Sequence, residues 1–214
     1  MQNWDWLGPW ILAYGHEMVE IHRAAPSRLA SMAVVFGRAL VNEPMMTWPL
    51  GGSPDDLEER ITLTYTLYLG PLLEEGLVWE TVDGRGAMVL VGPGQIDVWD
   101  EALDRVEQSP TRDVTDDGGL RHERFFDWVG SKIPPGPSWH LDSVAVEPSS
   151  QGRGIGSALI AFGLEQTFDS QYPVVLETGT ARNVPLYERH GFRLTEEADS
   201  PDGGPHVWFM RRDP

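Results

Sequence analysis

A strand that leads into a glycine loop and then into a helix limits the possible fold and function of this chain more than any other feature. Residues 138–156 read Ser-Trp-His-Leu-Asp-Ser-Val-Ala-Val-Glu-Pro-Ser-Ser-Gln-Gly-Arg-Gly-Ile-Gly, and an amphipathic run follows over Ser157–Phe168. The first backbone N–H groups of a helix have no partner inside the helix, and they lie at the positive end of its dipole. Glycines let the backbone approach a bound anion closely. The segment therefore predicts a site for a phosphate-bearing ligand.

The spacing of the glycines selects among the known phosphate loops. Gly152, Gly154 and Gly156 place the third glycine one residue too early for a dinucleotide fingerprint, which needs glycine where Ser157 stands. A P-loop is excluded because the loop contains no lysine. The loop Gln151–Gly156 instead resembles the pyrophosphate-binding loop of the GNAT acetyltransferases, whose pattern is Gln/Arg-x-x-Gly-x-Gly/Ala. The alternative is a glycine-rich helix entry that binds no ligand.

The strand before the loop carries a sign of a β-bulge. Its apolar positions are Trp139, Leu141, Val144 and Val146. Their alternation changes phase near Asp142–Ser143, and a shift of one residue is how a bulge shows in a sequence with period two. In the GNAT fold such a bulge opens a V between two parallel central strands, where the pantetheine arm lies. The alternative is a strand buried on both faces, since Ala145 blurs the alternation.

A second motif follows downstream. Pro173–Thr178 reads as a strand, and a short helix is predicted over about 184–190, with Asn183 as its N-cap and Gly191 at C′. The pattern Asn-x-x-x-Tyr-x-x-x-Gly-Phe is similar to the second GNAT motif. That resemblance implies that the Tyr187 hydroxyl lies near the thioester sulfur and protonates the departing thiolate. The alternative is a capped helix with an aromatic core residue.

The C-terminal part narrows the resemblance further. Over residues 138–214 the chain resembles the puromycin N-acetyltransferase-like branch of the GNAT superfamily. This implies an α/β (α+β) fold with a central mixed, mostly antiparallel sheet of about seven strands, splayed between strands 4 and 5 and flanked by helices. It also implies acetyl-CoA as co-substrate. The implied cofactor-binding residues are Val144, Ala145, Val146, Gln151, Gly152, Arg153, Gly154, Ile155, Gly156, Ser157, Asn183 and Tyr187.

Acetyl transfer to an amine also needs a base and a donor for the oxyanion. His140 occupies, by motif offset, the position of the catalytic glutamate in histone-acetylating relatives, and an imidazole accepts protons near neutral pH. A structural histidine on a central strand is the alternative. Asp142 is expected to orient His140 or to bind the ammonium group of the acceptor, and Glu177 is a second anchor for a cation. The backbone N–H of Val144, or of a near neighbour on the same strand, is the expected oxyanion donor.

Composition excludes several other functions. The 214 residues suit one domain spanning 1–214, and the absence of cysteine excludes disulfides and a cysteine nucleophile. A net charge of −17 argues against nucleic acid or a membrane as partner. His16 and His22 lack zinc-protease spacing, so no metal is expected. No secretion signal or membrane span is recognisable at the N-terminus, and a cytoplasmic protein is expected.

Two segments lie outside the GNAT pattern. Residues 1–15 form an N-terminal extension with Trp4, Trp6 and Trp10 before the first expected strand, Glu17–Arg23. The tryptophans are expected to bury against the body of the protein or against a second copy in a homodimer. Residues 95–137 form a helical insertion between strands 3 and 4, which either covers the acceptor pocket or packs on the edge of the sheet.

Together these features predict an N-acetyltransferase that acetylates a primary amine of a small molecule by direct attack on the thioester. The chemically competent pair Tyr187 and His140 favours an enzyme. The alternative is a protein that binds an acyl-CoA as a sensor and transfers nothing. The sequence does not identify the acceptor, and an aminonucleoside-like antibiotic, a polyamine, an amino acid or a biosynthetic intermediate would each fit.

Overall fold

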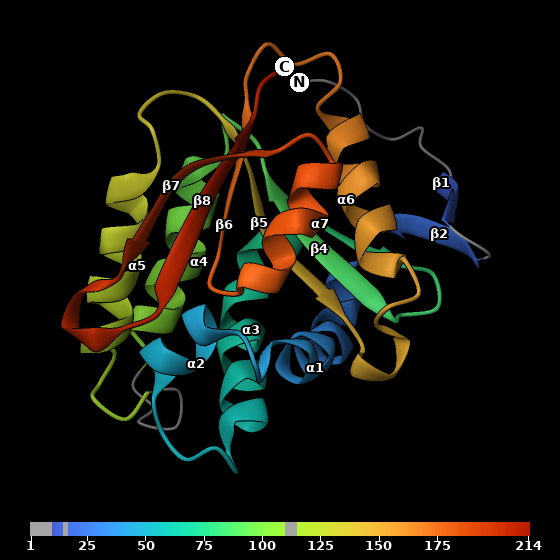
Figure 1. The fold of residues 1–214 in the computed structure, drawn as a ribbon. Coiled ribbons are helices and arrows are strands. Elements are labelled where there is room, and N and C mark those ends of the chain that lie inside the picture. Colours follow the sequence, from blue (N-terminus) through green and yellow to red (C-terminus); the bar gives the residue numbers. More distant parts are fainter. Residues whose placement is uncertain (1–9, 15–16, 110–114) are drawn as a thin grey trace.

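A computed structural model describes residues 10–14, 17–109 and 115–214. Among these residues an 8-stranded mixed sheet has the order β1-β2-β3-β4-β5-β6-β8-β7 (Figure 1). Neighbouring strands are antiparallel except β5 and β6, which run parallel. The strands are β1 (Trp10–Tyr14), β2 (Glu17–Arg23), β3 (Val78–Thr81), β4 (Gly86–Val91), β5 (Trp139–Val146), β6 (Val174–Thr178), β7 (Arg193–Asp199) and β8 (His206–Arg212).

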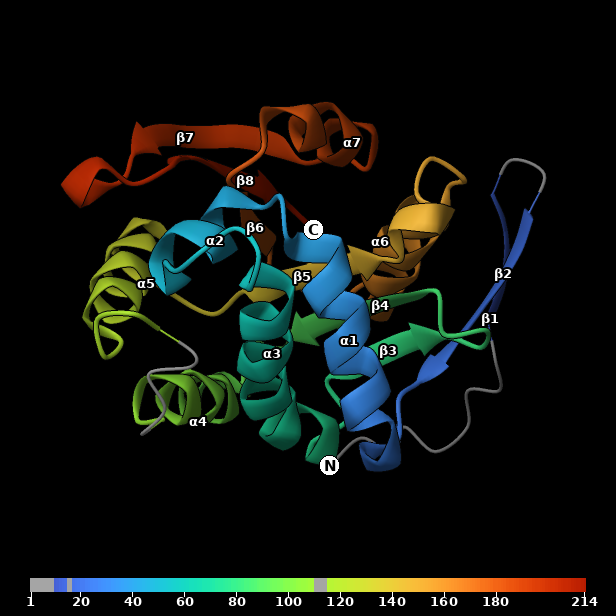
Figure 2. The same cartoon turned by 90° about the horizontal axis from the view of Figure 1, so that it is seen from below.

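The helices pack on both faces of this sheet. Across Figure 2, α4 and α5 lie on one side of α3, whereas α1 lies on its other side and α6 lies beyond α1. The helices are α1 (Leu29–Leu40), α2 (Pro44–Leu50), α3 (Leu57–Glu74), α4 (Ile96–Glu107), α5 (Leu120–Lys132), α6 (Ile155–Gln166) and α7 (Val184–Arg189). No described helix combines the length and the hydrophobicity that crossing a bilayer requires.

Strand β4 separates two hydrophobic clusters because its side chains alternate between the faces of the sheet. Ala87, Val89 and Val91 pack with α1, α3 and α4. Met88 and Leu90 pack instead with α6 on the opposite face. All six residues of β4 are buried, so this strand fixes both helical layers relative to the sheet.

The predicted bulge and splay are confirmed. Val89 pairs with Ser143, but the next residue, Leu90, pairs with Leu141, so Asp142 is the extra residue of a β-bulge. The described pairing of β5 with β6 is limited to Trp139 with Val174 and His140 with Val175. Beyond His140 the two parallel strands diverge, and the glycine loop lies at the far end of β5.

Two elements differ from the sequence prediction. Residues 10–14 form β1 and pair with β2, although the sequence places the first strand at Glu17–Arg23 and treats residues 1–15 as an extension. Trp4 and Trp6 lie outside the described residues. Helix α2 was not predicted because it is 7 residues long, with Pro44 at its start and Pro49 inside it. Between β4 and β5 the chain forms α4 and α5.

Candidate active site

The glycine loop leads directly into α6 and creates an anion-binding site at the start of this helix. Gly152 and Gly154 have φ angles of 76° and 90°, a left-handed conformation that disfavours other residues. The N–H of Ala158 donates to the Gly154 carbonyl at 2.9 Å and makes the first bond of the helix. The amides of residues 155–157 therefore have no partner within the helix and are available to an anion.

A cavity of about 450 Å³, called here the loop cavity, lies against this loop. Val144 and Val146 of β5 form one wall, and Arg182 and Arg189 contribute the two guanidinium groups of its lining. Of the residues predicted to bind the cofactor, the following line it: Val144, Val146, Gln151, Gly152, Gly154, Ile155, Gly156, Ser157, Asn183 and Tyr187. Free amides, cationic side chains and a strand edge fit a ligand with phosphates and an amide-bearing arm such as CoA.

Two predicted cofactor residues lie elsewhere. Ala145 is buried among the residues that pack against α1 and α3, on the opposite side of the strand from the cavity. Arg153 is exposed and is not part of the cavity lining. Conversely, Arg182 and Arg189 were not predicted, because single arginines around a short helix carry no periodic pattern. Asn183 occupies the N-cap position of α7, but its side chain makes no cap and donates instead to the Thr178 hydroxyl at 3.2 Å.

The backbone of β5 presents amides to the opening between β5 and β6. The N–H of Glu147 donates to the Arg85 carbonyl at 2.8 Å, so this residue faces β4. In an antiparallel pair the direction alternates from residue to residue. Val144 and Val146 therefore direct their N–H groups away from β4, and the Val146 carbonyl accepts a bond from Gln151 Nε2 at 3.1 Å on that side. This orientation suits Val144 as an oxyanion donor.

A second cavity, called here the helix cavity, has a volume of about 460 Å³ and lies among α3, α4, α5 and the splayed strands. Its floor includes Asp142 and Ser143 of β5 and Glu177 of β6. The two cavities share five lining residues: Leu40, Glu43, Val144, Asn183 and Tyr187. A ligand of the loop cavity and a ligand of the helix cavity would therefore meet beside the same few side chains.

Tyr187 lies at this junction. Burial raises the pKa of its hydroxyl, and the nearby carboxylates of Glu43 and Glu177 raise it further. The ring packs against Phe192 with centroids 6.0 Å apart. The raised pKa keeps the hydroxyl protonated, and it is available to a ligand because no hydrogen bond to it is found among the described residues.

His140 and Glu177 form a buried pair across the two parallel strands. His140 Nε2 lies 2.9 Å from Glu177 Oε2 and 3.1 Å from Oε1. Burial lowers the pKa of the imidazole, but the Glu177 carboxylate outweighs this and leaves the pKa raised above its usual value. Glu177 lines the helix cavity and His140 does not, so the carboxylate stands between the imidazole and the cavity.

No hydrogen bond joins Asp142 to His140 in the described part of the chain, and the two expected roles of Asp142, orienting His140 or binding the acceptor's ammonium group, stay predictions. The Asp142 carboxylate accepts hydrogen bonds from the Tyr68 hydroxyl at 2.7 Å, from Trp99 Nε1 at 3.1 Å and from the Ser143 hydroxyl at 2.6 Å. The reason is the bulge, which places Asp142 out of the alternation and directs it to donors on α3 and α4. Burial raises the pKa of this carboxyl, although the hydrogen bonds oppose the shift.

Glu43 was not predicted and belongs to the shared lining. It precedes α2, where Oε1 accepts the Gly179 N–H and Oε2 the Thr180 hydroxyl, both at 2.9 Å. Burial raises the pKa of its carboxyl, while these hydrogen bonds and the charge of Arg182 oppose the shift. A single glutamate before a short helix has no sequence signature, so only the tertiary structure identifies it.

These features define the class of protein. A mixed sheet whose central parallel strands diverge beside a glycine loop is the architecture of the GNAT N-acetyltransferases. Residues 118–194 match the family model described as an acetyltransferase (GNAT) domain. Over residues 118–194 the chain is therefore similar to a GNAT acetyltransferase domain, a type of enzyme that uses acetyl-CoA, and its fold is the GNAT fold. No group of three or more His, Asp or Glu side chains that could bind a metal ion occurs in the described part of the chain.

Three solved structures show how far the likeness extends. A histone acetyltransferase HPA2 and related acetyltransferase from Corynebacterium glutamicum is 19% identical, with 92% of this chain and 96% of that chain covered and a TM-score of 0.63. A mosquito arylalkylamine N-acetyltransferase like 5b is 15% identical, with 92% and 100% covered and a TM-score of 0.59. The Drosophila melanogaster polyamine N-acetyltransferase, which catalyses the formation of N-acetylagmatine, is 13% identical, with 92% and 100% covered and a TM-score of 0.59. At these identities the likeness establishes the fold and not the substrate.

Replacing Gly152 with Ala is expected to weaken acetyl-CoA binding about tenfold, which is roughly 1.4 kcal/mol. An added Cβ meets no protein atom within 4 Å and would occupy the space beside the loop, while the φ of 76° strains the backbone. Gly203→Ala is the matched control, because Gly203 has a φ of 75° and also has nothing within 4 Å. Calorimetric titration with acetyl-CoA should separate the two variants. Equal affinities in both would contradict the assignment of the loop.

Proposed function

We propose that the protein is an acetyl-CoA-dependent N-acetyltransferase that acetylates a primary amine of a small molecule by direct attack on the thioester. The observation that carries this proposal is the junction of the two cavities at Val144 and Tyr187. Reactants held in separate cavities that meet at one donor and one acid are already positioned for transfer. The resemblance to the puromycin N-acetyltransferase-like branch supports a small-molecule acceptor.

The residues of the loop cavity fit the cofactor. The amides of residues 155–157, with Arg182 and Arg189, would hold the phosphates. The free amide and carbonyl edge of β5 at Val144 and Val146 would hold the arm between the phosphates and the thioester. When bound, acetyl-CoA supplies an activated acetyl group.

The residues at the junction would then perform three tasks. Glu177, supported by His140, accepts a proton from the ammonium form of the acceptor, so that a neutral amine is present. The Val144 N–H stabilises negative charge on the carbonyl oxygen. Tyr187, kept protonated by its surroundings, donates its proton to the departing sulfur as the C–S bond breaks. The nitrogen, once bonded to the acetyl carbon, gives up its second proton, which restores the Tyr187 hydroxyl. His140 acts through Glu177 and is therefore a positioning residue.

An acyl-CoA sensor is the competing function. A sensor needs the loop cavity but has no use for a second cavity of similar volume that opens onto the same tyrosine. The expectations of a cytoplasmic protein and of a homodimer stay predictions.

The proposal is tested by following CoA release from acetyl-CoA with a panel of primary amines, puromycin included, while acetyl-CoA binding is measured in parallel. Turnover with at least one amine is expected, with the acetylated amine identified by mass spectrometry. Tight binding of acetyl-CoA without turnover across a broad panel would favour the sensor. Absence of binding would overturn both functions.

A further inference from the structure

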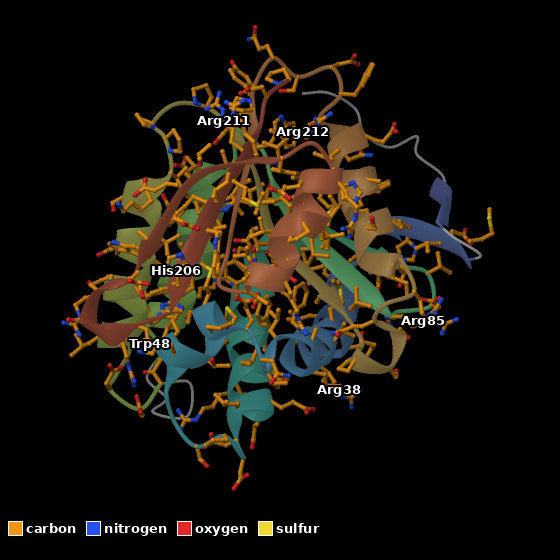
Figure 3. All side chains as sticks on the ribbon, in the orientation of Figure 1. Arg38, Trp48, Arg85, His206, Arg211 and Arg212 are labelled. Atoms are coloured by element: carbon orange, nitrogen blue, oxygen red, sulfur yellow. The ribbon has the colours of Figure 1, made fainter. Side chains whose placement is uncertain are left out.

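The helix cavity is lined by charge of a single sign. Six carboxylates contribute to it: Glu43, Asp100, Glu107, Asp127, Asp142 and Glu177. No lysine or arginine occurs among the described residues that line it. Figure 3 shows where labelled arginines lie instead: Arg85 is at the turn between β3 and β4, and Arg211 and Arg212 are at the end of β8. A cavity of this kind favours cations over neutral or anionic molecules.

The carboxylates fall into two groups at different places in the fold. Glu43, Asp142 and Glu177 belong to the reactive end, where Glu43 and Glu177 are the carboxylates close to Tyr187 and Asp142 is close to Glu177. Asp100, Glu107 and Asp127 come from α4 and α5, which lie on the far side of α3 from α1 (Figure 2). One primary amine at the reactive end can engage only the first group. The second group is left for another part of the ligand.

A buried histidine nitrogen without a hydrogen bond marks this second end. The side chain of His122 is 3% exposed and lines the cavity, yet its Nδ1 makes no hydrogen bond in the described protein. Glu107 Oε1 lies 3.8 Å from that nitrogen, too far for a hydrogen bond. A donor with several N–H groups placed between them would bond to both, and an ammonium or guanidinium group has this property.

Aromatic side chains line the cavity at both ends. Tyr68 and Trp99 donate hydrogen bonds to Asp142 at the reactive end, and the Phe126 ring lies 4.5 Å from the His122 ring at an angle of 46°. Such walls suit a hydrocarbon spacer and also attract cations to their faces. We propose that the acceptor is a dication, with its reacting amine beside Glu177 and a second ammonium or guanidinium group held by Glu107 and His122. This inference rests on the proposed function and names its substrate class.

The test compares matched acceptors that differ only in the second cation: putrescine with butylamine, cadaverine with pentylamine, and agmatine as the guanidinium case. The diamines are expected to exceed the monoamines in kcat/KM by about tenfold or more, the usual gain from hydrogen bonds to a charged group. Glu107→Gln should reduce the ratio of kcat/KM for the diamine to kcat/KM for the matched monoamine toward one. Glu101→Gln, on the same helix but outside the cavity lining, should keep the wild-type preference. If Glu107→Gln fails to fold, Asp127→Asn takes its place in the test. This substitution is at an exposed cavity residue and should also lower the preference for diamines.

The outcomes separate this inference from the proposed function. Equal kcat/KM for diamines and monoamines, with acetyl transfer to both, would overturn the dication and leave the N-acetyltransferase intact. A preference for diamines that Glu107→Gln and Asp127→Asn both retain would also overturn the second site. Binding of acetyl-CoA without transfer to any amine would overturn the proposed function itself.

Discussion

Tyr187→Phe is expected to lower kcat for acetyl transfer by a factor of about 10² to 10³, the range typical of a lost general acid. The substitution removes one hydroxyl at the junction of the two cavities and keeps the ring that packs on Phe192. Because the hydroxyl has no partner in the described protein, its removal leaves no buried group unsatisfied. The loss should therefore fall on kcat, with acetyl-CoA affinity changed by less than about twofold.

The measurement is steady-state kinetics with the best amine, together with calorimetric titration of acetyl-CoA. Tyr172→Phe is a suitable control, because Tyr172 precedes β6 and is not among the residues that line either cavity. Wild-type turnover in Tyr187→Phe would show that the thiolate leaves without this proton and would remove Tyr187 from the mechanism.

Glu177→Gln is expected to have the second-largest effect, a fall in kcat/KM of about 10²-fold with retained acetyl-CoA binding. The pair of His140 and Glu177 must be unprotonated to accept a proton from the acceptor. Wild-type activity should therefore rise with pH through the raised pKa of His140. Without the Glu177 carboxylate, only the charge of Asp142 opposes the effect of burial on His140, and the pKa of the imidazole should fall. The acid limb of the pH–rate profile should then move to lower pH.

The pair of His140 and Glu177 also determines how the free energy of unfolding should change with pH. The pKa of His140 is higher in the folded than in the unfolded protein, so the pair stabilises the fold fully below the unfolded pKa and loses this contribution as pH rises through the folded pKa. Glu177→Gln should lower the free energy of unfolding by about 2 kcal/mol at acidic pH and by less at alkaline pH. Denaturant unfolding at several pH values measures this.

His140→Gln is the companion variant. It should lower the rate less than Glu177→Gln, and the double variant should be no slower than Glu177→Gln alone, because both residues act as one unit. An acid limb that stays in place in both single variants would contradict the assignment of the pair. Additive losses would instead mean that His140 contacts the acceptor independently.

Local features of the sequence predicted the parts of the site that are local in the structure. The phase change in β5 predicted the bulge at Asp142, and the glycines predicted a phosphate loop, in which Gly152 and Gly154 adopt left-handed conformations. Both signals lie within a few residues of the structure that they specify. The short helix around Tyr187 was predicted for the same reason, since Asn183 precedes it and Gly191 follows it.

The helix cavity could not be predicted because it is assembled from segments far apart in the chain. Glu43 reaches Thr180 across 137 positions, and Tyr68 reaches Asp142 across 74. The sequence left open whether Asp142 orients His140 or binds the ammonium group of the acceptor. In the fold, donors on α3 and α4 bond to Asp142, and Glu177 bonds to His140. Which of several competing partners a buried carboxylate selects depends on packing that no local pattern encodes.

A crystal structure with CoA and a diamine bound tests the central claim most directly. The account predicts that the CoA phosphates bind at the start of α6, that the sulfur lies within hydrogen-bonding distance of the Tyr187 hydroxyl, and that an amine nitrogen lies beside Glu177. A CoA whose arm lies outside the opening between β5 and β6, with its sulfur remote from Tyr187, would contradict the account.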